Sequence, residues 1–469
     1  MRFTFKKCVN VRVNRIVIRN FKNLRDVNLK PKKYNVIVGP NGSGKTNFLE
    51  FFKLLRRIYV ERCPYPFLEW GGYDNVVWNR ETRLPIGFEV ETVEEATPGD
   101  LVKRYVLREV SNEREKERKE APPLRVFHRI SAELWAKNER LVMLRESAEV
   151  EVPELNYRFS MEKDGDTLKI SLNGKTCEID ARRVGIRSLH LELSHVIREA
   201  LVAKEGGDQI LIHDYVDSLL FDRILEEMPK GFMTVKEGLA LKLARWIPQE
   251  KAYPLIGYLP TLIYHPLLTL FKTIVLFPLN LAEVRRRKVL AADKPLEERG
   301  ENALDSLYFK QLRDGRLPER VEYAIRTYFG GTVYFKEGNL YFYDQEGGVE
   351  FPKEHLPDGL LKTLVILTAV EQEPSMILID EMENSLHAEL LEFLVRVLRE
   401  DYGGCVFLTT HSPLVVDLVE DLEELWVFKP TGKGVEVRNA ASYRGEEELR
   451  KELEELGLSL GYKVLYGLT

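Results

Sequence analysis

The chain contains the stretch Gly39-Pro40-Asn41-Gly42-Ser43-Gly44-Lys45-Thr46, which fits the pattern G-x-x-x-x-G-K-[ST]. Residues 36–38 before it are apolar and β-branched, which is typical of a buried strand. Residues 47–55 after it place apolar side chains at helical spacing. A strand, a glycine-rich loop and a helix in this order point backbone N–H groups and the positive end of a helix dipole at a phosphate. The stretch therefore predicts a phosphate-binding loop (P-loop) rather than an ordinary glycine-rich turn.

Each side chain of this loop has an expected part in binding a nucleotide. Lys45 would reach the β- and γ-phosphates, and the Thr46 hydroxyl would bind Mg²⁺. The glycines permit positive φ angles and a close approach of the backbone to the phosphates. The predicted nucleotide contacts of the loop are Asn41, Gly42, Ser43, Gly44, Lys45, Thr46 and Asn47.

A second set of candidate residues follows a later apolar strand. Residues 376–379 are uniformly apolar, and Asp380 and Glu381 come directly after them. Carboxylates at the C-terminal end of a buried strand lie where α/β sheets bind their ligands. We expect Asp380 to hold the magnesium ion, directly or through water, and Glu381 to orient and deprotonate the attacking water. After the next predicted strand, His411 could donate a hydrogen bond to the γ-phosphate.

Composition sets the class of protein but not its partner. With 469 residues, the chain is long enough for two or three domains, or for one domain with a large insertion. The net charge of −5 argues neither for nor against nucleic acid. Four scattered cysteines without a C-x-x-C pair, and no signal peptide, predict a cytoplasmic protein. The scarcity of glutamine beside abundant Glu, Lys and Arg favours a heat-adapted source.

The pattern along the chain predicts three parts with boundaries near residues 110 and 300. The charged run 111–120 marks the first boundary. In the middle part, residues 157–179 alternate between turns of the Asp-Gly and Asn-Gly type, which predicts a three-stranded meander, with helices after it. The part 301–469 carries helices, a hairpin over residues 332–343 and two strand–helix units.

The run 252–281 is nearly free of charge and long enough to span a bilayer. Four prolines interrupt it, and each removes a helical hydrogen bond, so we expect no membrane span. A buried pair of short helices and an exposed partner-binding surface both remain open for this run.

The motif set resembles the SMC/RecF class of ABC-type ATPases, in particular the compact RecF-like predicted ATPases of the AAA family. The matching segments are residues 20–22, 39–47, 377–381, 384–387 and 410–413. The resemblance implies an α/β fold. A P-loop NTPase head of mixed sheet and flanking helices, built from residues 1–110 and 301–469, would be interrupted by a mixed α+β insertion domain over 111–300. Without a persistent heptad pattern, that insertion excludes the long arms of SMC proteins.

The same resemblance implies the cofactors and the assembly. Two molecules of ATP, with Mg²⁺, would lie between the P-loop and the signature loop of a head-to-tail homodimer. Lys22, Asp358 and Gly359 would add contacts to the nucleotide, and residues 384–387 would lie at the dimer seam. The signature loop, which should read roughly Leu-Ser-x-Gly, reads Leu356-Pro357-Asp358-Gly359 here. Proline offers neither a hydroxyl nor an N–H group, so we expect a slow, switch-like ATPase.

Two classes of function remain open. One is an ATP-dependent DNA machine for repair or genome maintenance, in which the basic residues 1–33 and 285–288 would contact phosphates with a steep dependence on salt. The other is a nucleotide-gated regulatory subunit that controls a partner nuclease or toxin in a defence system and docks it through residues 111–300. A third, weaker possibility is an ATP-binding scaffold that barely turns over.

Overall fold

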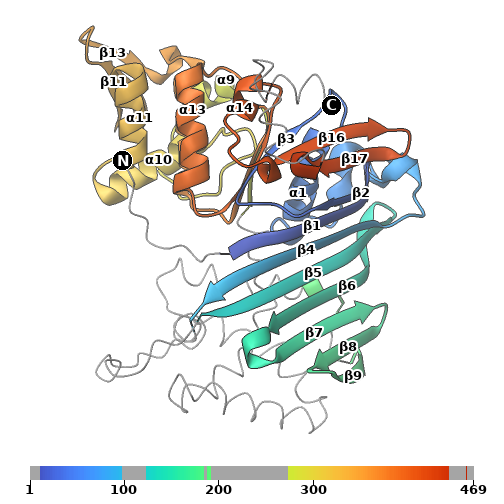
Figure 1. The fold of residues 1–469 in the computed structure, drawn as a ribbon. Coiled ribbons are helices and arrows are strands. Elements are labelled where there is room, and N and C mark those ends of the chain that lie inside the picture. Colours follow the sequence, from blue (N-terminus) through green and yellow to red (C-terminus); the bar gives the residue numbers. More distant parts are fainter. Residues whose placement is uncertain (1–10, 98–122, 184–186, 192–272, 443–460, 462–469) are drawn as a thin grey trace, which may run out of the picture. The chain divides into compact units, whose positions relative to one another are not determined.

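The computed structural model describes residues 11–97, 123–183, 187–191, 273–442 and 461. The chain forms two compact units, each built from separate stretches of sequence (Figure 1). The first unit comprises Met1–Cys8, Pro31–Lys53 and Lys272–Thr469, and the second comprises Val9–Lys30 and Leu54–Phe271.

A six-stranded sheet forms the centre of the first unit, in the order β10-β14-β15-β3-β16-β17. The first five strands in this order pair in parallel, and β17 pairs antiparallel with β16. The strands of this sheet are β3 (Tyr34–Val38), β10 (Thr273–Leu276), β14 (Met376–Ile379), β15 (Cys405–Thr409), β16 (Leu425–Thr431) and β17 (Gly434–Asn439). Every residue of β3, β10, β14 and β15 is buried, as expected for parallel strands covered on both faces.

Helices accompany this sheet. They are α1 (Lys45–Tyr59), which continues into the second unit, α9 (Leu281–Arg286), α10 (Ala303–Asp314), α11 (Glu319–Phe329), α12 (Asp358–Glu371), α13 (Ala388–Arg396) and α14 (Pro413–Asp417). Helix α12 is buried at every residue from 360 to 370, which explains why its sequence is largely apolar. The predicted α/β architecture, a mixed sheet with flanking helices, is confirmed.

The hairpin predicted over residues 332–343 is also confirmed. Strands β11 (Gly331–Lys336) and β12 (Asn339–Asp344) pair antiparallel, and β13 (Val349–Pro352) adds a third strand to this small sheet.

A buried asparagine connects the central strands of the six-stranded sheet. Asn35 of β3 is 0% exposed. Its Nδ2 donates to the carbonyl oxygens of Lys32 at 2.8 Å and Val406 at 3.0 Å, and its Oδ1 accepts from the Trp426 indole at 3.2 Å. The side chain therefore links β3 to both neighbouring strands, β15 and β16.

Replacing Asn35 with alanine should lower the free energy of unfolding by about 2–3 kcal/mol, because polar groups in the core lose their partner. Chemical denaturation of the two proteins measures the change. The matched control is Gln345→Ala, at an exposed turn of the same unit, which should leave stability unchanged. Equal stability of Asn35→Ala and the wild-type protein would contradict a bridging role.

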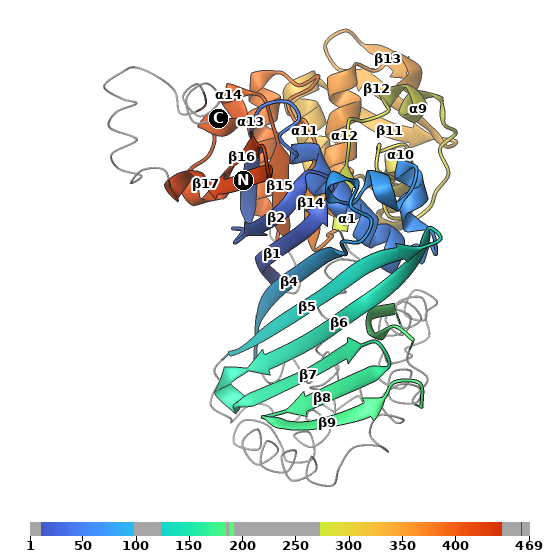
Figure 2. The same ribbon diagram turned by 90° about the vertical axis from the view of Figure 1, so that its right-hand side faces the viewer.

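An eight-stranded antiparallel sheet dominates the second unit, in the order β2-β1-β4-β5-β6-β7-β8-β9 (Figure 2). Its strands are β1 (Val11–Phe21), β2 (Leu24–Leu29), β4 (Ile86–Ala96), β5 (Leu124–Lys137), β6 (Arg140–Val152), β7 (Tyr157–Asp164), β8 (Thr167–Leu172) and β9 (Lys175–Asp180). The predicted meander over residues 157–179 is β7-β8-β9, the end of this larger sheet.

The two units divide the chain differently from the predicted boundaries. Strands β4 and β5 lie on either side of residue 110 in the sequence, yet they pair from Ile86↔Leu134 to Ala96↔Leu124. One sheet therefore joins residues predicted to belong to the first ATPase lobe with residues predicted to form the insertion. The predicted strand over 101–110 and most of the predicted helices over 186–247 lie outside the described residues.

The described end of the uncharged run 252–281 differs from both structures considered for it. Residues 273–276 form the buried strand β10, paired in parallel with β14, rather than part of a helix or an exposed surface. Residues 252–272 lie outside the described part of the chain. Among the residues that are described, no helix combines the length and the apolar character needed to cross a membrane.

Candidate functional site

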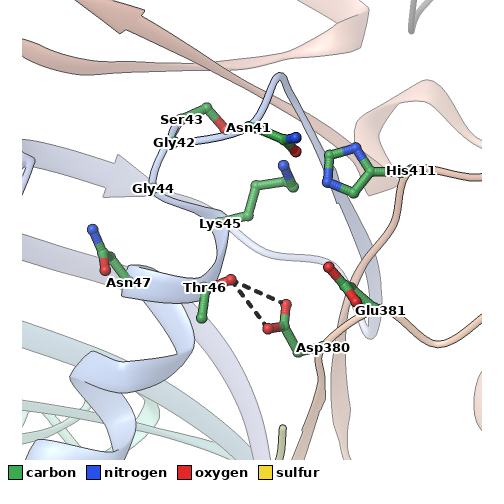
Figure 3. Close-up of a pocket in the computed structure, with 10 residues that line it drawn as sticks. All are labelled: Asn41, Gly42, Ser43, Gly44, Lys45, Thr46, Asn47, Asp380, Glu381 and His411. Carbon is green, nitrogen blue, oxygen red and sulfur yellow. Dashed lines mark hydrogen bonds between the residues drawn. The ribbon is translucent and has the colours of Figure 1, made fainter. Parts of the chain in front are cut away.

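A pocket in the first unit brings together three segments that are far apart in the sequence (Figure 3). The P-loop follows β3, Asp380 and Glu381 follow β14, and His411 follows β15. Because these strands are parallel neighbours, their C-terminal ends meet at the same edge of the sheet. The lining residues are Asn41, Gly42, Ser43, Gly44, Lys45, Thr46, Asn47, Asp380, Glu381 and His411.

The glycines of the loop are required by its backbone. Gly39 has φ +154°, and a Cβ atom there would lie 2.2 Å from the carbonyl oxygen of Phe428. Gly44 has φ +95°, and its carbonyl accepts the first helical hydrogen bond of α1, from the Phe48 N–H at 2.9 Å. The loop thus turns sharply into α1, whose N-terminus lies at the pocket.

The Lys45 side chain extends along the loop. Its Nζ donates to the carbonyl oxygens of Gly39 at 2.7 Å and Pro40 at 3.1 Å. Burial lowers the pKa of the Lys45 ammonium, and the nearby carboxylates of Asp380, Glu381 and Glu383 oppose that shift. The lysine therefore supplies positive charge at a site where three carboxylates are close by.

Thr46 and Asp380 form a pair of oxygen ligands suited to a divalent cation. The Thr46 hydroxyl donates to Asp380, with 3.0 Å between Oγ1 and Oδ2 (Figure 3). Mg²⁺ binds oxygens at about 2.0–2.1 Å in an octahedron, so adjacent ligand oxygens lie about 3 Å apart. The pair therefore fits Mg²⁺, which when bound would neutralise phosphate charge. Burial raises the pKa of Asp380, and hydrogen bonds from the Thr409 and Thr46 hydroxyls oppose this shift.

Glu381 is held in a strained backbone conformation by three neighbours. Its φ of +49° lies in the left-handed region, which is uncommon for a residue other than glycine. Its N–H donates to Thr409 Oγ1 at 3.1 Å, and its Oε2 accepts from Asn384 Nδ2 at 2.8 Å. Its carbonyl oxygen accepts from Lys362 Nζ at 3.1 Å. These contacts fix where the carboxylate stands, as a general base requires.

Lys362 is a residue of the site that sequence reasoning missed. It lies on α12 and is 6% exposed, and its Nζ also donates to the Asn384 carbonyl at 2.9 Å. Burial lowers the pKa of Lys362 to about 8, against the opposing influence of Glu383 and Glu381. The signal available in the sequence was a single lysine within the apolar run 360–370.

His411 lines the pocket, and its backbone is tied to a second residue that sequence reasoning missed. The His411 N–H donates to Glu383 Oε1 at 2.7 Å, while the neighbouring Ser412 N–H donates to Thr410 Oγ1 at 2.9 Å. Glu383 therefore connects the segment after β14 to the segment after β15.

Three predicted nucleotide contacts are not among the residues that line this pocket, as far as the described part of the chain shows. Asp358 and Gly359 form the first turn of α12, with Pro357 as the preceding N-cap residue. Lys22 belongs to the second unit, where its Nζ lies 5.5 Å from the ring centroid of Trp70. Contacts from these residues to a nucleotide therefore remain predictions.

Two family models match the segments that supply the pocket. Residues 12–69 match the model described as "AAA ATPase domain". Residues 264–417 match the model described as "AAA domain, putative AbiEii toxin, Type IV TA system". The two matches together contain the P-loop, Asp380, Glu381 and His411. Both models describe AAA ATPase domains, so the segments that supply the pocket are similar to such domains.

Solved structures similar to this chain include heads of SMC proteins. The Smc head domain of Pyrococcus furiosus, with an extended coiled coil and bound to the C-terminal domain of ScpA, is 11% identical, with a TM-score of 0.36 over 95% of this chain and 100% of that chain. The SMC head domain from Thermotoga maritima is 11% identical, with a TM-score of 0.34 over 91% and 98%. An SmcHead bound to the C-winged helix domain of ScpA is 10% identical, with a TM-score of 0.40 over 92% and 99%. No curated protein matches the sequence.

The titration of Lys362 should be visible in the pH dependence of ATP turnover. As pH rises through about 8, Lys362 loses its proton, and its bonds to the carbonyls of Glu381 and Asn384 weaken because charge-assisted hydrogen bonds are about twice as strong as neutral ones. Turnover of the wild-type protein should therefore fall across this range. Lys362→Arg, which stays charged, should lack that decrease.

Steady-state ATP hydrolysis on both sides of this pH measures the difference, and Lys362→Met should be slow at every pH. The free energy of unfolding depends on pH in the opposite direction from turnover. The folded-state pKa of about 8 lies below the ordinary 10.5, so the contribution of Lys362 to stability rises with pH between these values. Identical activity profiles for the wild-type protein and Lys362→Arg would contradict the positioning role of Lys362.

Proposed function

We propose that this ATPase is a slow, magnesium-dependent switch that closes as a head-to-tail homodimer around two ATP molecules. The observation that carries the proposal is the pocket in which Lys45, Thr46, Asp380, Glu381 and His411 come together. These residue types match the parts needed for phosphoryl transfer, which depends mostly on positioning and electrostatic stabilisation.

Each residue has a distinct role in the proposed reaction. Lys45 and the loop N–H groups bind the phosphates, and Thr46 and Asp380 hold Mg²⁺. Glu381 orients the attacking water and accepts its proton, and His411 donates to the γ-phosphate. Asp380 and Glu381 follow one another in the sequence, so the metal ligand and the general base come from one short turn after β14.

Replacing Glu381 with glutamine should leave ATP binding unchanged and lower turnover by at least about 100-fold, the usual contribution of a general base. Binding of a fluorescent ATP analogue and phosphate release measure the two effects. Lys45→Ala serves as the comparison, because it should lose binding as well. Normal turnover by Glu381→Gln would refute the base assignment.

The composition of residues 356–359, the signature-like loop, supports the proposal that turnover is slow. Pro357 stands where the resemblance expects a serine, and proline has neither the hydroxyl nor the N–H that would reach a γ-phosphate across the dimer. Gly359 retains its N–H as a donor.

Replacing Pro357 with serine should therefore tighten ATP-dependent dimerisation by about 10- to 100-fold, the range for one hydrogen bond to a charged group. Light scattering with ATP in the Glu381→Gln background measures the dimer, with ADP as the control nucleotide. An unchanged dimer affinity would mean that the functional signature loop lies elsewhere in the chain.

Two kinds of target can be coupled to this switch, and one observation favours a protein over DNA. Two of the basic residues proposed for DNA are paired with acidic neighbours: Arg287 with Glu297, and Arg15 with Glu89. Paired cations release fewer counterions from DNA, which weakens binding. We therefore favour a regulatory subunit that controls a protein partner over a DNA-dependent ATPase, with residues 111–300 as its docking segment.

Measuring turnover at low salt with single- and double-stranded DNA separates the two targets. Stimulation that disappears as salt rises supports a DNA machine, through the exposed Arg286 and Lys288. Turnover that is indifferent to DNA, together with a stable protein that co-purifies, supports the regulatory subunit.

A further inference from the structure

An arginine contacts the signature-like loop at the place where proline has removed donors. Arg285 lies on α9, and its Nη2 donates to the Leu356 carbonyl oxygen at 2.8 Å and to the carboxylate of Asp358. The Arg285 side chain is 23% exposed and that of Asp358 is 53% exposed. The guanidinium thus flanks Pro357 through the residues on either side of it.

Most of the hydrogen-bonding capacity of this guanidinium is still available. An arginine carries five N–H donors in a fixed planar fork. Within the described ranges, Arg285 donates hydrogen bonds through Nη2, and the N–H groups of Nε and Nη1 can bind another acceptor. Phosphate oxygens are acceptors that match such a fork.

The negative charge of Asp358 would repel ATP from this loop, so a cation beside it is needed for ATP to bind there. The carboxylate lies in the first turn of α12, where the helix dipole stabilises it. An incoming triphosphate would be repelled by Asp358, and Pro357 offers no hydroxyl or N–H to offset that repulsion. Arg285 is the cation already bonded to the carboxylate.

We propose that Arg285 contacts the γ-phosphate of the ATP bound to the partner protomer, in place of the donors that Pro357 lacks. In the free protomer, Asp358 competes with that phosphate for the guanidinium, so the ion pair restrains dimer closure until ATP is bound. The inference rests on the proposed homodimer and adds to it a residue that acts across the interface.

A purely structural role for Arg285 makes a different prediction. If the arginine only holds the shape of the loop, removing either member of the Arg285–Asp358 pair would have the same effect. If the arginine binds phosphate, removing Arg285 weakens the dimer, whereas removing the charge of Asp358 releases the guanidinium and strengthens it.

The experiment measures ATP-dependent dimerisation by light scattering, in the full-length protein carrying Glu381→Gln. Arg285→Ala should weaken the dimer by about 10- to 100-fold, as expected for one or two hydrogen bonds to a charged group. Arg285→Lys should recover part of that affinity, and Asp358→Asn should dimerise more tightly than the parent. Arg326→Ala, at an exposed arginine on α11 of the same unit, is the matched control and should not differ from the parent.

Two further measurements show whether a weaker Arg285→Ala dimer results from lost ATP binding or from lower stability of the monomer. Binding of a fluorescent ATP analogue to dilute monomer, and the melting temperature, should both be unchanged in Arg285→Ala. Weakening by Asp358→Asn, loss of ATP affinity in the Arg285→Ala monomer, or an unaffected dimer in Arg285→Ala would each overturn the inference. If the Glu381→Gln parent does not dimerise with ATP, the proposed homodimer itself fails.

Discussion

The parallel pairing of β3, β15 and β14 is the constraint on which the site depends. Ile379 of β14 pairs with Leu408 of β15, and Leu408 pairs in turn with Val36 of β3. This register sets the ends of the three strands side by side, so the loops that follow them meet at one edge of the sheet. The P-loop after β3, the two acids after β14 and the histidine after β15 therefore lie in one pocket as a direct result of the strand pairing.

This arrangement places several carboxylates close together in a partly buried pocket, where their negative charge is unfavourable. Neighbouring hydroxyl and ammonium groups stabilise them. Burial alone would raise the pKa of Asp380, and the hydroxyls of Thr46 and Thr409 counter that effect. Lys45 and Lys362 place two ammonium groups near the acids, one from the P-loop and one from α12. Because Lys362 belongs to the helix that begins at the signature-like loop, α12 joins that loop directly to the turn containing Glu381.

The pocket residues that could be predicted from the sequence are those that belong to short contiguous motifs. The P-loop, the Asp380–Glu381 pair and His411 each follow a short apolar strand, so their local patterns were enough to place them. Lys362 and Glu383 were missed because their roles depend on how a buried helix and a turn pack against distant segments. The same limit applied to the fold, since the pairing of β4 with β5 and the strand β10 are long-range pairings that local periodicity does not encode.

The most direct test of this account is hydrolysis of ATP by the wild-type protein in a single turnover, with and without Mg²⁺. The Thr46–Asp380 oxygens are placed as two neighbouring ligands of that ion. We predict ATP cleavage that requires Mg²⁺, stops when a chelator removes the ion and returns when the ion is restored. Cleavage that proceeds equally well without a divalent cation, or no cleavage in its presence, would contradict it.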